Sequence, residues 1–80
     1  MTFIETKIRE AEELMKRNQL IQSWEELSDN DLDRVLYLSN KVFCEAAEAQ
    51  RDGSLSEPIS DAQVKRINKF LKWDTSLGQE

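Results

Sequence analysis

Apolar residues recur at helical spacing in three stretches of the chain, and the spacing breaks in the two segments between them. In the first stretch, Thr2 followed by Glu5 fits a capping box, the pairing of side chains that satisfies the free N–H groups at a helix start. The apolar positions that follow lie three or four residues apart: Ile4, Ile8, Ala11 and Met15. This pattern predicts a helix over residues 3–17.

The opposite side of this first helix is charged. Glu5, Arg9, Glu13 and Arg17 alternate in sign at every fourth position, a spacing at which neighbouring side chains attract each other along a helix. We expect this face to be solvated.

Between residues 18 and 27 the helical spacing is lost, although Leu20, Ile21, Trp24 and Leu27 are apolar. Ser23 and Glu26 are spaced as a second, weaker capping box. We therefore expect a connection that contains one short helical turn near residues 23–27, with Trp24 tucked inward.

The second helix has the best-marked start in the chain. Ser28 and Asp31 form a capping box, and Leu27 and Leu32 flank it as a hydrophobic staple. The helix is predicted over residues 29–50, with Leu38 and Ala49 on one border of its apolar stripe. At 100° per residue the stripe itself comprises Leu32, Val35, Leu36, Ser39, Val42, Phe43, Ala46 and Ala47.

Two residues on the polar side of this helix are not charged. Tyr37 and Cys44 are one heptad apart, so in a regular α-helix they lie one above the other, facing away from the core. An apolar stripe this broad, in so short a chain, predicts surface that two neighbouring helices do not cover.

The third helix also has clear signals at its start. Gly53 is a natural left-handed end for the second helix, and residues 55–58 form a link. Ser60 and Gln63 form a further capping box, flanked by the staple Ile59 and Val64. We predict a helix over residues 61–73 with a buried face that comprises Val64, Ile67, Phe70 and Leu71, and a flexible tail over residues 74–80. The expected fold is all-α: a small bundle of three main helices in a single domain, residues 1–73.

Composition excludes most familiar catalytic chemistry. The 80 residues contain no His and one Cys, which removes the commonest general base, the His-paired nucleophiles and most transition-metal sites. Asp29, Asp31 and Asp33 alternate like the start of a calcium loop, but Arg34 and Asn40 stand where that loop needs Gly and Glu. We therefore expect no enzyme, no cofactor and no metal.

The same counts bear on the compartment. A lone Cys44 cannot form an internal disulfide, which favours a reducing environment. The first nine residues lack the apolar run of a secretory signal, and no stretch is long and apolar enough to span a membrane. We expect a cytoplasmic protein.

Charge is unevenly distributed along the chain. The net charge is −5, and five acidic residues but no Lys or Arg lie between residues 18 and 33. The last predicted helix, in contrast, has Lys65, Lys69 and Lys72 on one face. Because phosphate attraction needs a basic footprint, direct nucleic-acid binding is disfavoured. About nine residues separate the last two helices, too many for the turn of a helix-turn-helix motif.

One string resembles a known family. Residues 26–32, Glu-Leu-Ser-Asp-Asn-Asp-Leu, enter a long helix that is followed by a Pro-containing link and a short basic helix. This arrangement resembles the Hha/YmoA family of small nucleoid modulators, which are helical and bind a nucleoid-structuring partner. The resemblance implies an alternative function, that of an acidic antagonist or modulator of a nucleic-acid-binding protein, such as a phage-type inhibitor. No site residue is carried over from the family.

The sequence therefore predicts a protein-interaction module or small regulator. We expect the partner to be a protein with a basic or apolar docking surface, or a second copy of the chain in a homodimer. Large aromatic residues dominate interface energetics. The five acidic residues between residues 18 and 33, which we call the acidic block, offer charge complementarity to a basic surface. The predicted partner-binding residues are Trp24, Glu25, Glu26, Asp29, Asp33, Tyr37, Leu38, Lys41 and Cys44.

Overall fold

The protein folds into a small all-α bundle, as the sequence predicts. The computed structural model describes residues 2–55 and 57–78. The helices in chain order are α1 (Phe3–Arg17), the 3₁₀ turn η1 (Trp24–Glu26), α2 (Asp29–Leu36), the π-helical segment η2 (Tyr37–Phe43), α3 (Cys44–Asp52) and α4 (Asp61–Gly78).

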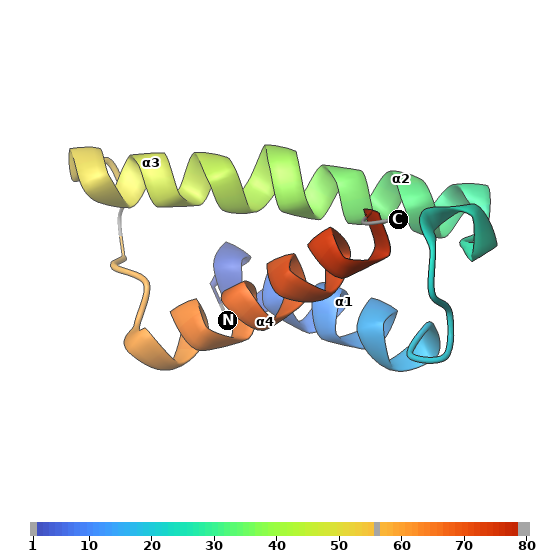
Figure 1. Cartoon of the computed structure of the whole chain (residues 1–80). Helices are drawn as coiled ribbons and strands as arrows, with labels where there is room; N and C mark the ends of the chain where they lie inside the picture. The colour runs from blue at the N-terminus through green and yellow to red at the C-terminus, as the bar shows by residue number, and fades with distance from the viewer. Residues whose placement is uncertain (1, 56, 79–80) are drawn as a thin grey trace.

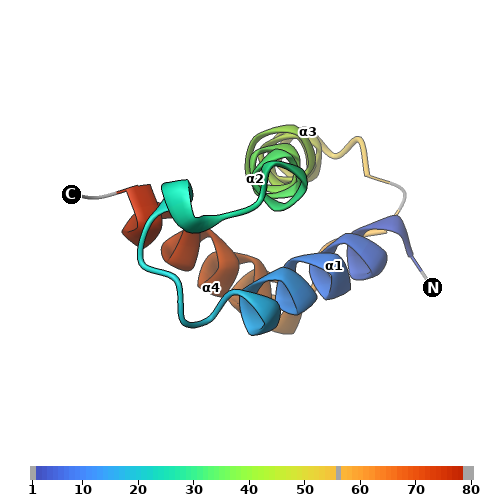
Figure 2. The same ribbon diagram turned by 90° about the vertical axis from the view of Figure 1, so that its right-hand side faces the viewer.

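The segments α2, η2 and α3 join end to end into one long helix, which we call the central helix (Figure 1). Helices α1 and α4 lie side by side beneath it, and Figure 2 shows the central helix end-on above this pair. Helix α4 begins well below α3 and rises toward α2 at its C-terminal end (Figure 1). The two ends of the central helix are therefore supported differently.

The core lies where the three long helices face each other. Phe70 of α4 is fully buried at its centre, with its ring edge-on to that of Phe43 at a centroid distance of 5.8 Å. The other buried apolar side chains come from every part of the bundle: Ile8, Ala11, Leu14, Leu27, Val35, Leu38, Val42, Ala46, Ile67 and Leu77.

The predicted helix starts are confirmed by their capping bonds. The backbone N–H of Glu5 donates to the Thr2 hydroxyl at 3.1 Å, and that of Asp31 donates to the Ser28 hydroxyl at 3.2 Å. Ser60 and Gln63 exchange two reciprocal bonds, of 3.1 and 3.2 Å. Gly53 ends the central helix with a φ of 75°, the left-handed conformation expected of it.

The central helix departs from the prediction within its middle turns. Residues 37–43 form a π-helix, in which each turn is wider than in an α-helix and each residue advances by less than 100°. Leu38, predicted at the border of the stripe, is only 1% exposed, whereas Leu36 and Ala47, predicted within the stripe, are exposed. Ser39 is buried as predicted, and its hydroxyl donates to the Val35 carbonyl at 2.7 Å.

The last helix is longer than predicted. We expected it to end at Trp73 and residues 74–80 to be flexible, but α4 continues to Gly78; Gln79 and Glu80 lie outside the described residues. The added turn is held by tertiary contacts. Leu77 is buried, and the indole Nε1 of Trp24 donates to Asp74 Oδ1 at 3.0 Å.

The face of α1 that we expected to be solvated is only partly so. Arg66 of α4 reaches two carboxylates of α1, with its Nη1 3.0 Å from Glu5 Oε1 and its Nε 3.0 Å from Glu12 Oε2. At the other end of α1, Arg17 binds Asp31 of α2 through two hydrogen bonds. These ion pairs fix α1 against both of its neighbours.

We expect Arg66→Gln to make the protein less stable at neutral pH and less sensitive to acid. Hydrogen bonds from Gln63 and Arg66 lower the pKa of Glu5, and those from Arg66 lower the pKa of Glu12, below the ordinary value of 4.5. A carboxyl group whose pKa is lowered by folding stabilises the protein at pH values above its ordinary pKa. This stability is lost as the pH falls through the lowered pKa of the folded state. Thermal melts between pH 7 and pH 2 measure how the stability of each protein depends on pH.

Arg9→Gln is the matched control, because Arg9 is exposed and its Nε lies 3.9 Å from the same Glu5 carboxylate. Solvent-exposed ion pairs at this distance contribute little to the free energy of unfolding. A melting profile of Arg66→Gln that matches Arg9→Gln at every pH would contradict the role assigned to Arg66.

Candidate functional site

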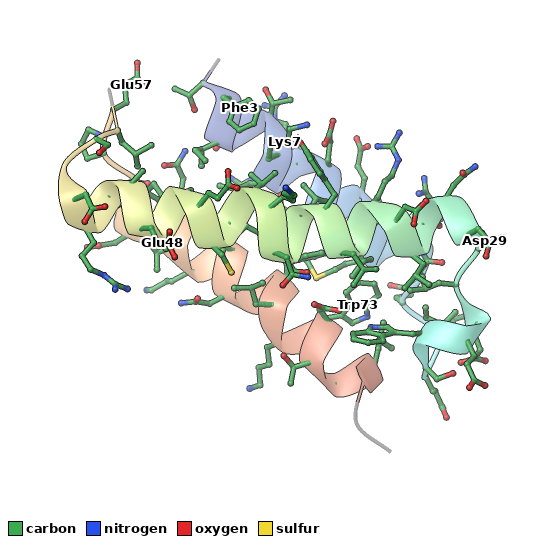
Figure 3. The ribbon with its side chains drawn as sticks, turned by 90° about the horizontal axis from the view of Figure 1, so that it is seen from above. Phe3, Lys7, Asp29, Glu48, Glu57 and Trp73 are labelled. Carbon is green, nitrogen blue, oxygen red and sulfur yellow. The ribbon has the colours of Figure 1, made fainter. Side chains whose placement is uncertain are left out.

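An open groove of about 610 Å³ runs along one side of the central helix. Its walls are the N-terminal turn of α1, the central helix from Tyr37 to Ala49, and the link before α4. Figure 3 shows Phe3, Lys7 and Glu57 on this side of the central helix, and Glu48 and Trp73 on the other. The apolar lining comes from all three walls: Phe3, Ile4, Tyr37, Val42, Ala46, Ala49, Leu55, Pro58 and Ile59.

Two aromatic rings stand exposed at one end of the groove. Phe3 is 62% exposed and Tyr37 is 46% exposed. The Lys7 ammonium lies over both rings, 5.4 Å from the Phe3 centroid and 5.3 Å from the Tyr37 centroid, and it pairs with Glu10 at 3.3 Å. Because cation–π contacts hold a ring near the charge, Lys7 orients the rings of Phe3 and Tyr37. Both rings nevertheless remain exposed to solvent.

The wall formed by α3 is thinly supported. All residues of α3 are described, and Ala46 is the buried one among them. The helix has apolar surface on both sides, because a second groove of about 410 Å³ lies between α3 and α4, with Ala47 and Val64 in its lining. In Figure 1, α4 diverges from α3 toward the N-terminal end of α4.

The predicted binding residues on the central helix have three different environments. Tyr37 and Lys41 line the groove and are exposed. Leu38 is buried in the core, so its prediction as a contact residue is wrong; the π-helical turn carries it beneath the helix. Cys44 is exposed but does not line the groove, and its thiol donates to the Ser39 carbonyl at 3.2 Å. Tyr37 and Cys44 therefore do not share a face, contrary to the prediction.

The other predicted residues lie at or before the N-terminal end of the central helix. Trp24, Glu25, Glu26, Asp29 and Asp33 are all exposed around η1 and the start of α2. Their acidic block is interrupted, because Asp31 is turned toward Arg17 and accepts a further bond from Asn18 at 3.0 Å. Asp33 lies one helical turn before Tyr37, but no residue of this group lines the groove with Tyr37 and Lys41.

Within that group, Trp24 and Glu26 already have intramolecular roles. The Glu26 carboxylate accepts from the backbone N–H of Ser23 at 3.1 Å, which completes the predicted capping box. The Trp24 indole is partly exposed rather than tucked inward; it packs against Gly78, where an added Cβ would lie 3.2 Å from the ring. Burial raises the pKa of Asp74, and the hydrogen bond from the Trp24 indole opposes that rise.

Sequence patterns missed most of the groove. Phe3 flanks the first apolar stripe, Leu55 and Pro58 lie in a segment we interpreted only as a link, and Ile59 had a role only in a staple. The signal available in the sequence was Phe3, a large aromatic residue at the start of the first helix and outside the spacing of its apolar stripe.

The described residues contain no group of three Cys, Asp or Glu side chains placed to hold a metal ion. In the same part of the chain, no helix is both long and apolar enough to cross a membrane. Comparisons with protein-family models, with curated proteins and with solved structures found nothing that matches this chain.

Proposed function

We propose that the protein is a non-enzymatic interaction module that docks an apolar segment of a partner protein in the groove between α1, the central helix and the link. The observation that carries this proposal is the open apolar lining, with Phe3 and Tyr37 exposed at its edge. Large aromatic side chains beside a pocket are the usual anchors of protein interfaces. The lone Cys44 favours the cytoplasm, where it stays reduced.

A protein partner suits this groove better than nucleic acid. The lining is mainly apolar, and the chain has a net charge of −5, which repels phosphate. The volume of about 610 Å³ suits a few large side chains of a short segment and is within the range of ligand pockets.

The test compares one substitution on the two sides of α3. Ala49 lines the proposed groove and Ala47 lines the second groove, so Ala49→Arg and Ala47→Arg place the same charged side chain in either one. Affinity purification from the native cell identifies the partner, and the purified partner is then titrated against each variant. We expect Ala49→Arg to weaken binding about tenfold or more, because it buries an unpaired charge, with Ala47→Arg close to wild type.

Circular dichroism establishes that both variants keep their helicity. Equal affinities for Ala49→Arg and wild type would overturn the proposal. Weaker binding by Ala47→Arg alone would assign the docking surface to the second groove instead.

A further inference from the structure

Four residues of the central helix, each four positions apart, line the groove in a row: Tyr37, Lys41, Glu45 and Ala49. All four are at least partly exposed. They form a strip with an aromatic ring at one end, a cation and an anion in the middle, and a small side chain at the other end. We call this row the central strip.

The central strip is complementary to itself when reversed. Two copies aligned antiparallel about position 43 place Lys41 of each copy opposite Glu45 of the other. The same alignment places each exposed Tyr37 ring over Ala49 of the other copy, where the small side chain leaves room for it. A two-fold symmetric interface requires this property. If residue i of one copy contacts residue j of the other, then residue j of the first copy must contact residue i of the second.

The charges in the strip have no ion-pair partner within the described part of the chain. Neither Lys41 nor Glu45 is among its five ion pairs within 4.0 Å. They are four residues apart on one helix, but the Lys precedes the Glu, which is the weaker order for pairing within a helix. Both side chains are therefore available to an external partner.

We infer that the central strip binds a second copy of this chain, with the two central helices antiparallel and two Lys41–Glu45 pairs formed between the copies. This inference rests on the proposed function, since it gives the same groove a specific occupant. It also makes the two occupants exclusive: a partner segment in the groove displaces the second copy.

The test is a charge exchange read by sedimentation equilibrium over a range of concentrations. In the symmetric pair, Lys41→Glu places two Glu–Glu contacts in the interface, and Glu45→Lys places two Lys–Lys contacts. We expect each single variant to self-associate about tenfold or more weakly than wild type. The double variant Lys41→Glu/Glu45→Lys restores both pairs and should self-associate like wild type.

Mixing provides a second, stricter measurement. A copy with Lys41→Glu and a copy with Glu45→Lys are complementary at both contacts. An equal mixture should therefore form dimers at concentrations at which each variant alone is monomeric. The control pair Lys65→Glu and Asp61→Lys reverses exposed charges on α4, outside the groove, and should leave self-association unchanged.

A wild-type chain that stays monomeric at every concentration would overturn the inference, as would a mixture that fails to dimerise. In either case, partner binding that remains sensitive to Ala49→Arg would leave the proposed function standing. Self-association that follows the charge exchange, together with partner binding insensitive to Ala49→Arg, would overturn only the proposed function.

Discussion

Replacing Phe70 by Ala is expected to lower the free energy of unfolding by about 3–5 kcal/mol. Phe70 is fully buried, and its ring centroid lies 5.8 Å from those of both Phe43 and Trp73. Its loss removes the ring contact with Phe43 of the central helix and leaves a cavity at the centre of the core. Because a chain of 80 residues has about 4–12 kcal/mol of stability in total, a large share of the variant should be unfolded at 37 °C. Urea denaturation followed by circular dichroism measures the change.

Phe3→Ala is the matched control for this prediction, since it makes the same chemical change at a residue that is 62% exposed. Its effect on stability should be within about 0.5 kcal/mol. Comparable losses for the two variants would show that Phe70 does not have the central place in the core that its burial indicates.

The second large effect is expected at Leu38. Leu38→Ala should cost about 2–5 kcal/mol, because the side chain is 1% exposed and packs within the core cluster. Leu36→Ala, two residues earlier in the same continuous helix, should cost clearly less, because Leu36 is 39% exposed. Thermal and urea unfolding of the two variants side by side measure the difference.

This pair also tests the helix geometry. A regular α-helix from residue 29 to residue 50 places Leu36 in the apolar stripe and Leu38 at its border. Equal costs, or a larger cost at Leu36, would contradict the burial pattern of the π-helical segment.

The helix starts could be predicted from the sequence because they depend on local chemistry. Thr2, Ser28 and Ser60 each cap the helix that follows through a bond to a backbone N–H three residues on. Such signals require no knowledge of distant residues. The left-handed end at Gly53 was predictable for the same reason.

The side-chain environments in the middle of the central helix could not be predicted in this way. The sequence of residues 37–43 contains no Pro or Gly to mark a change of helix type. The wider turns of η2 come with tertiary packing, since they place Leu38, Ser39, Val42 and Phe43 together on the buried side. A fixed rotation of 100° per residue therefore assigns Leu38 to the wrong environment.

The end of α4 depends on a contact between residues 50 positions apart. The segment after Trp73 has no apolar repeat beyond Leu77, and its last turn is held by the bond from Trp24 to Asp74 and by packing of the indole on Gly78.

The groove could not be predicted from the sequence for a related reason. Its three walls come from separate parts of the chain, so their separation is set by how the helices cross.

The weak support of α3 has a consequence for motion. Segments with little buried surface open locally at a lower free-energy cost than the rest of a protein, and their amide hydrogens exchange faster with solvent. Since α3 buries Ala46 alone among its nine residues, its far turns can bend or unwind while the core around Phe70 stays closed. We therefore expect the α3 wall of the groove to open at a lower free-energy cost than the core around Phe70, so that the groove changes its width without global unfolding.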